Sequence, residues 1–189
     1  PIPRPQAPDH HLSVPRSMHL ILIGLRGSGK TSAGRRAAGL SSRPFIDLDD
    51  VTESVCGMTA KACFETAGEA TWRTAEAIAL ERTIASTTPS VIALGGGTPT
   101  APGVAALLEA ARDEGRARIV RLHASTQRLV ARIAGDPGRP ALTGLDPGEE
   151  MKSIEAIRGP LFARLASSTI DTEDRSVERV AAAIVDLMA

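Results

Sequence analysis

A glycine-rich segment, residues 24–31, has the composition and spacing of a loop that binds phosphate groups. It reads GLRGSGKT and fits the pattern G-x-x-x-x-G-K-[ST]. In such a loop the glycines let backbone N–H groups point inward at a phosphate. The lysine reaches the β and γ phosphates of a nucleotide, and the hydroxyl that follows it binds Mg²⁺. The pattern therefore predicts a nucleotide-phosphate site made of Gly27, Ser28, Gly29, Lys30, Thr31 and Ser32.

Acidic residues at the end of a predicted strand form a second candidate group. Residues 45–50 read FIDLDD, and side-chain alternation along a strand puts Asp47 and Asp49 on one side of the chain. Ligands bind at the carboxyl edge of a doubly wound sheet. One carboxylate there can hold a metal ion through water, while the other accepts a hydrogen bond from a substrate hydroxyl and takes its proton. Helix capping is the alternative role, and we expect it of Asp50.

Arginines and a run of three glycines form a third group. Arg73 lies in a predicted helix, Arg132 and Arg139 flank the start of a proline-containing stretch, and Arg158 precedes the sequence GPLF. Arginine is suited to paired hydrogen bonds with carboxylates and phosphates, although a single arginine is more commonly a solvated surface group. The glycines at residues 95–97 would let the backbone approach a ligand closely, with a plain loop as the alternative.

The elements that position these residues alternate between short apolar runs and helical stretches. Runs typical of buried parallel strands occur at residues 20–23, 44–47, 91–94, 118–122 and 169–171. Apolar spacing near 3.6 residues predicts helices over residues 71–85 and 177–187, and residues 31–40 are rich in helix formers. The alternation predicts an α/β fold in which helices sandwich a five-stranded parallel sheet.

Two segments do not fit this alternation. Residues 135–148 contain three prolines and three further residues able to carry charge, and we interpret this long connection as a flap that closes over a site as a lid. Residues 1–17 contain five of the thirteen prolines and lack the pattern of a signal peptide. We expect them to be a flexible tail or linker before a single domain at residues 18–189. The adjacent His10 and His11 are better explained as solvated side chains than as metal ligands.

The overall composition argues against several classes of function. The 22 Lys plus Arg residues balance the 22 Asp plus Glu residues, and with four aromatic residues in total we expect no binding to nucleic acid. The apolar fraction of 42% suits a globular core, and without an apolar run of about 18 residues we expect no membrane span. We interpret Cys56 and Cys63 as packing residues in a reducing cytoplasm, with a disulfide or a reactive thiol as alternatives.

Together these residues resemble the shikimate kinase family. The resemblance runs from about residue 18 to the C-terminus. It includes the loop GLRGSGKT, the strand end FIDLDD, GEATWR at residues 68–73 with Glu76 after it, the three glycines, RPAL at residues 139–142 and RGPLF at residues 158–162. It implies the fold of a P-loop NTPase, similar to nucleoside-monophosphate kinases with a lid. It also implies that a cytoplasmic monomer phosphorylates shikimate to shikimate 3-phosphate in aromatic amino acid biosynthesis, with ATP as co-substrate and Mg²⁺ as cofactor.

The resemblance also implies roles for individual residues. The catalytic residues would be Lys30, Asp49 and Arg139. Arg139, on the lid, would reach the transferred phosphate, and Arg132 would cover the adenine. Mg²⁺ would be held by Thr31 and Asp47. Within a substrate-binding segment at about residues 51–85, Glu76 would orient Arg73. The whole substrate site would comprise Asp49, Phe64, Trp72, Arg73, Gly95, Gly96, Gly97 and Arg158, with both arginines on the carboxylate of shikimate.

Two other functions remain open from the sequence. Similar domains resemble the C-terminal halves of some helix-turn-helix regulators, so the chain could be a ligand sensor with residues 1–17 as its linker. A sensor, however, need not keep the base and the substrate arginines. Another small-molecule P-loop kinase, such as a gluconate or nucleotide kinase, is the second alternative. The combination of Arg73 and Arg158 with Asp49 disfavours it.

Overall fold

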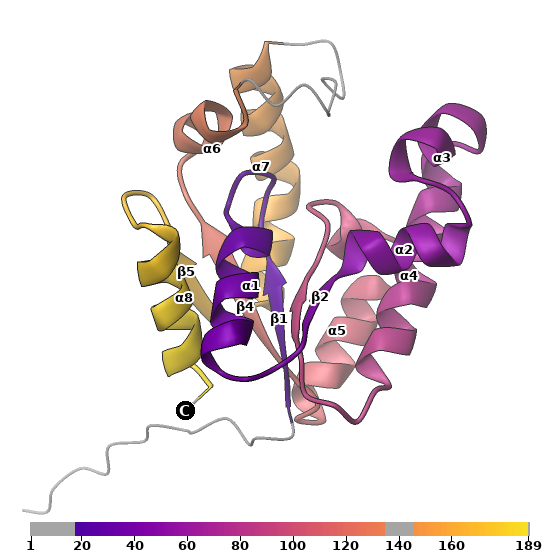
Figure 1. The fold of residues 1–189 in the computed structure, drawn as a ribbon. Coiled ribbons are helices and arrows are strands. Elements are labelled where there is room, and N and C mark those ends of the chain that lie inside the picture. Colours follow the sequence, from indigo (N-terminus) through magenta and orange to yellow (C-terminus); the bar gives the residue numbers. More distant parts are fainter. Residues whose placement is uncertain (1–17, 135–145, 189) are drawn as a thin grey trace, which may run out of the picture.

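The computed structural model describes residues 18–134 and 146–188, and within them the chain forms a five-stranded sheet surrounded by helices (Figure 1). The strand order is β2-β3-β1-β4-β5, and every pair of neighbouring strands is parallel. The strands are β1 (His19–Ile23), β2 (Phe45–Asp47), β3 (Val91–Ala93), β4 (Ala117–His123) and β5 (Ser168–Asp171). The predicted fold class is confirmed.

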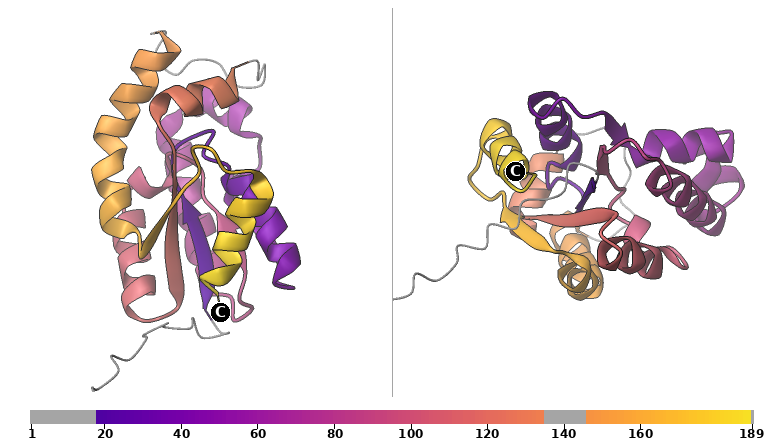
Figure 2. Two further views of the ribbon diagram at one scale, coloured as in Figure 1. Left: turned by 90° about the vertical axis from the view of Figure 1, so that its left-hand side faces the viewer. Right: turned by 90° about the horizontal axis from the view of Figure 1, so that it is seen from below.

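Helices connect the strands and cover both faces of the sheet. They are α1 (Lys30–Leu40), α2 (Leu48–Cys56), α3 (Ala60–Thr66), α4 (Glu69–Ile84), α5 (Val104–Asp113), α6 (Thr126–Ile133), α7 (Pro147–Leu165) and α8 (Val177–Asp186), with a short 3-10 helix η1 (Thr98–Thr100). Helices α4, α5 and α7 pack against one face, and α1 and α8 against the other (Figure 2). The three predicted helices correspond to α1, α4 and α8.

The central strand, β1, is covered by helices on both of its faces. All five residues of β1 are buried. Ile21 and Ile23 pack with the side chains of α4, α5 and α7, whereas Leu20 and Leu22 pack with those of α1 and α8. Because successive side chains point to opposite faces and both faces are covered, the strand must be apolar throughout.

The junction of β2 and α2 differs from the prediction. The strand ends at Asp47, and helix α2 begins at the next residue, Leu48. Asp47 is the N-cap, and its Oδ1 accepts a hydrogen bond from the backbone N–H of Asp49 at 3.3 Å. The predicted cap at Asp50 is therefore wrong, as is the placement of Asp49 on a strand face. Asp49 and Asp50 both lie in the first turn of α2, where the helix dipole favours negative charge.

Two predicted segments lie largely outside the described residues. The expected tail, residues 1–17, and residues 135–145 of the expected lid lie outside the described residues. At the end of the lid, Asp146 caps α7 by accepting hydrogen bonds from the N–H groups of Gly148 and Glu149. Helix α7 begins at Pro147, so the last two residues of the predicted flap are helical.

The two cysteines lie next to each other near the end of α2 and in α3. Both are free thiols, and their Sγ atoms are 3.3 Å apart. Cys63 is fully buried, in agreement with the predicted packing role. Among the described residues, no helix is long and apolar enough to cross a membrane.

Helix α7 offers a direct test of the packing. Phe162 is fully buried against the sheet, while Ile157 on the same helix is 73% exposed. We expect Phe162→Ala to lower the free energy of unfolding by about 3–5 kcal/mol, because it removes a large buried ring and leaves a cavity. The control Ile157→Ala should change it by less than about 0.5 kcal/mol. Urea denaturation measures both values, and similar losses in the two variants would contradict the described packing of α7.

Candidate active site

The loop at residues 24–29 joins β1 to α1 and forms the phosphate-binding end of the site. Gly24 has φ 147°, and a Cβ atom there would collide with the backbone carbonyl oxygen of Leu122, so this position requires glycine. Lys30 folds over the loop, and its Nζ donates to the carbonyl oxygens of Gly24 and Leu25 at 2.9 Å each. In the described part of the chain, no side chain caps α1. Its first N–H groups therefore suit an anion.

A cleft of about 650 Å³ extends from this loop along the carboxyl edge of the sheet. Its lining brings together predicted residues from separate parts of the chain: Gly27, Ser28, Gly29, Lys30, Thr31, Ser32, Asp47, Asp49, Gly95, Gly96 and Arg132. Arg26, Thr172 and Arg175 also line it, although the sequence analysis did not select them. The parallel arrangement explains this convergence, because β1, β2, β3 and β5 all end at this edge.

Thr31 and Asp47 meet beside the phosphate-binding loop, as the predicted metal site requires. The Thr31 hydroxyl donates a hydrogen bond to Asp47 Oδ2 at 3.0 Å. Two protein oxygens at this spacing suit Mg²⁺, which usually takes one or two protein ligands and completes its shell with phosphate oxygens and water.

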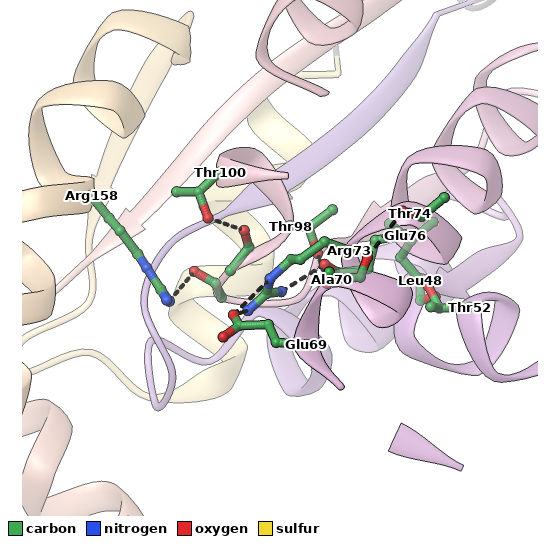
Figure 3. A network of polar contacts seen from close by, with 12 residues as sticks. Leu48, Thr52, Glu69, Ala70, Arg73, Thr74, Glu76, Thr98, Thr100 and Arg158 are labelled. Atoms are coloured by element: carbon green, nitrogen blue, oxygen red, sulfur yellow. Dashed lines mark hydrogen bonds and ion pairs between the residues drawn. The ribbon is translucent and has the colours of Figure 1, made fainter. Parts of the chain in front are cut away.

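The three-glycine segment, residues 95–97, is the point where the predicted substrate residues converge. A Cβ atom on Gly95 would lie 2.7 Å from Asp49 Oδ1, and one on Gly97 would collide with the Arg73 guanidinium. From the opposite side, Arg158 Nη1 donates to the Gly96 carbonyl oxygen at 2.9 Å (Figure 3). Side chains from α2, α4 and α7 can approach one another here because the backbone between them lacks side chains.

Arg73 is held by two glutamates on its own helix. Its Nη2 donates to Glu69 Oε1 at 2.8 Å, and its Nη1 donates to Glu76 Oε2 at 2.6 Å (Figure 3). Burial alone would lower the pKa of Arg73, but the hydrogen bonds and charges of Glu76 and Glu69 outweigh it and raise that pKa. The contact between Glu76 and Arg73 agrees with the implied orienting role. The spacing of Glu69, four residues before Arg73, could have identified this second partner.

Arg158 lies close enough to Arg73 for their charges to interact unfavourably. Burial lowers the pKa of the Arg158 guanidinium, and the positive charge of Arg73 lowers it further. Two half-buried cations facing a common space favour an anionic ligand, because a carboxylate between them would relieve the repulsion.

Arg132 joins the phosphate-binding loop to the segment after β5. Its guanidinium donates to the Gly27 carbonyl oxygen at 3.4 Å, to Thr172 Oγ1 at 3.1 Å and to the Glu173 carbonyl oxygen at 3.2 Å. It also donates to the backbone oxygen of Thr172. These contacts hold Arg132 at the end of the cleft that lies away from Asp49. Arg139 falls outside the described residues.

The two aromatic residues predicted to line the substrate site pack against each other. The ring centroids of Phe64, on α3, and Trp72, on α4, are 6.0 Å apart. Trp72 is 3% exposed, whereas Phe64 is 40% exposed. The pair joins α3 to α4, and neither residue is among those that line the cleft, so its contact with a substrate stays a prediction.

Fold and site together define a P-loop phosphotransferase whose acceptor is a small anionic molecule. Comparison with known proteins gives the same result. The sequence model of shikimate kinase matches residues 26–189, which is most of the chain. The chain therefore belongs to the shikimate kinase family.

Individual relatives agree with this assignment. The chain is 35% identical over 159 residues to the shikimate kinase of Bordetella pertussis, an alignment that covers 84% of this chain and 72% of the relative. It is 33% identical to the shikimate kinase of Pseudomonas paraeruginosa, with coverage of 89% and 95%. The solved structure of Acinetobacter baumannii shikimate kinase in complex with shikimate superimposes with a TM-score of 0.81 at 29% identity, covering 92% of this chain and 94% of that one.

The contact of Gly97 with Arg73 leads to a test of the arginine site. In Gly97→Ala a methyl group would occupy the position of the Arg73 guanidinium, while the backbone φ of −105° suits alanine. We expect affinity for shikimate to fall about tenfold, because one charge-assisted contact is displaced. Nucleotide affinity should not change, and calorimetric titration measures both. Gly39→Ala is the control, since nothing lies near the added methyl group. Full shikimate affinity in Gly97→Ala would exclude Arg73 from the site.

Proposed function

We propose that this chain transfers the γ-phosphoryl group of ATP to the 3-hydroxyl group of shikimate, with the residues described above in the roles that follow. The observation that carries the proposal is the convergence of Arg73, Arg158 and Asp49 on the three-glycine segment, beside the phosphate-binding loop. The likeness to a shikimate kinase solved in complex with shikimate supports the choice of substrate.

Backbone groups and Lys30 would bind the phosphates of ATP. The first N–H groups of α1 have no side-chain cap, and the Lys30 ammonium lies over the loop that precedes the helix. Lys30 would exchange its loop carbonyl contacts for phosphate oxygens and neutralise charge that develops during transfer. Arg132 would cover the adenine at the far end of the cleft, and Arg139 would contact the transferred phosphate.

Thr31 and Asp47 would hold a magnesium ion through their side-chain oxygen atoms, which suit its preference for oxygen ligands. When bound, Mg²⁺ would supply positive charge next to the β and γ phosphates. Asp47 also caps α2, so the same residue fixes the first turn of the helix that carries Asp49.

The acceptor would bind with its carboxylate between Arg73 and Arg158 and its ring hydroxyls toward Asp49. Asp49 would accept a hydrogen bond from the reacting hydroxyl and take its proton as the phosphoryl group is transferred. Phosphoryl transfer passes through a loose transition state, so most of the catalysis would come from positioning and charge neutralisation. A cytoplasmic monomer stays a prediction.

An activity assay separates the enzyme from the ligand sensor. ADP should form rapidly when ATP and shikimate are both present, and the carboxamide of shikimate should be a much poorer acceptor because it lacks the charge that the arginines bind. Lys30→Ala should lower kcat about 10³-fold, the scale of single groups that stabilise developing charge. The control Lys152→Ala, on the exposed side of α7, should keep full activity. Shikimate-independent ADP formation, or equal use of both acceptors, would overturn the proposed substrate.

The neighbouring aspartates of α2 provide a matched pair for testing the base. Asp49→Asn keeps the size of the side chain but removes its charge and basicity, so we expect kcat to fall about 10²-fold or more while ATP binding is nearly unchanged. Asp50→Asn removes a charge from the same helical turn. Asp50 also lines the cleft, but its side chain is exposed, so water and salt screen its charge and kcat should stay within about twofold. Equal kcat values for the two variants would show that Asp49 does not act on the hydroxyl.

A further inference from the structure

We propose that Thr98 is a positioning residue, which acts through Glu76 to hold Arg73 in the orientation that binds the substrate carboxylate. The proposal rests on the proposed function for its kinetic consequences. Thr98 begins η1, directly after the three-glycine segment, and has no exposed surface. No motif in the sequence singles it out.

Thr98, Glu76 and Arg73 form a continuous chain of hydrogen bonds, here called the Thr98 network (Figure 3). The Thr98 hydroxyl donates to Glu76 Oε1 at 2.5 Å, and Glu76 Oε2 accepts from Arg73 Nη1 at 2.6 Å. One oxygen of the carboxylate thus binds the hydroxyl and the other binds the guanidinium. The orientation of the carboxylate depends on both contacts, and this carboxylate is one of the two, with that of Glu69, that set the direction in which Arg73 points.

The second partner of Arg73 cannot replace this support. The Glu69 side chain is 63% exposed, whereas the Glu76 side chain is 1% exposed. An exposed ion pair contributes little, because water and salt screen it and both side chains lose freedom. A buried carboxylate is held more firmly, provided that donors satisfy its oxygens. Glu76 is therefore the firm support, and Thr98 is the group that satisfies its second oxygen.

Thr98 also links Arg73 to the backbone that the other substrate residues contact. Its N–H donates to the Gly95 carbonyl oxygen at 3.2 Å, which fixes η1 against the three-glycine segment. A Cβ atom on Gly95 would lie 2.8 Å from Thr98 Oγ1 and 2.7 Å from Asp49 Oδ1. The Thr98 network therefore sets the position of Arg73 relative to Asp49, which would bind the opposite end of the substrate.

The test removes the hydroxyl without changing the shape of the side chain. We expect Thr98→Val to raise KM for shikimate about tenfold, since hydrogen bonds to charged groups contribute on this scale. KM for ATP and kcat should stay within about twofold, because the nucleotide half and Asp49 are not in the network. Thr98→Ser keeps the hydroxyl and should restore a KM near that of the wild type.

A matched control separates this role from a general loss of packing. Thr83 is also buried, lies on the same helix as Glu76 and donates its hydroxyl to a backbone oxygen, that of Ala79. Thr83→Val should leave KM for shikimate unchanged.

A double variant tests whether Thr98 acts through Glu76. In a Glu76→Gln background, Thr98→Val should raise KM for shikimate by less than a further twofold, because contacts in one network are not additive. If Thr98→Val does not fold, Thr98→Ala replaces it.

A measurement without substrate keeps the proposal independent of the assigned reaction. Exchange with water of the Arg73 Nη–H protons, which include the donor to Glu76, is followed by NMR on protein with ¹⁵N-labelled arginine. It should be faster in Thr98→Val than in the wild type and unchanged in Thr83→Val. An unchanged exchange rate, or a KM for shikimate that does not rise, would overturn the role of Thr98. Failure of the wild type to phosphorylate shikimate would instead overturn the proposed function, and the exchange rates would still decide whether Thr98 orients Arg73.

Discussion

In a parallel sheet the carboxyl ends of all strands lie at the same edge. Because β1 pairs directly with β3, the segments that follow these two strands lie next to each other, and they carry the two halves of the site. Leu22 lies opposite Ala93 in the register, so the phosphate-binding loop that follows β1 leaves the sheet beside the three-glycine segment that follows β3. A Cβ atom on Gly96 would lie 3.3 Å from the backbone nitrogen of Arg26. Donor and acceptor sites are thus adjacent because of backbone pairing, and the side chains refine a geometry that the sheet has already set.

In the acceptor half of the site two arginines lie close together, and neighbouring groups neutralise their positive charges only in part. Arg73 is neutralised by Glu76 and Glu69, whereas Arg158 donates to a carbonyl oxygen, which carries only a partial charge. The pKa of Arg158 is lowered because its guanidinium is half-buried and lies near the positive charge of Arg73. Under the proposed function a carboxylate would bind strongly here, because the ligand would supply the missing negative charge to donors that are already oriented.

Local patterns in the sequence predicted what depends on local physics, and failed where the tertiary structure decides. Apolar runs identified β1, β3 and β4 because these strands are covered on both faces, and the short runs of the partly exposed edge strands β2 and β5 were also recognised. The glycine-rich pattern identified the loop because its backbone geometry needs those residues. The change from strand to helix at Asp47 was missed, since FIDLDD is compatible with either structure until the packing of α2 is known. Thr98 carried no signal, because its partner Glu76 lies 22 residues away in the sequence and the two meet only in the folded chain.

Asp47 contacts both halves of the site, because one of its oxygens binds Thr31 beside the phosphate-binding loop and the other binds the start of α2. Asp47 Oδ2 accepts from the Thr31 hydroxyl, while Oδ1 accepts from the backbone N–H of Asp49. One carboxylate therefore contacts the hydroxyl of the proposed metal site and also fixes where the first turn of α2 begins. Had Asp47 and Asp49 shared the face of a strand, they would stand about 7 Å apart along an extended backbone. The helical turn instead lets Asp49 approach Gly95, so the proposed base would reach the acceptor from a helix whose start is tied to the phosphate-binding side.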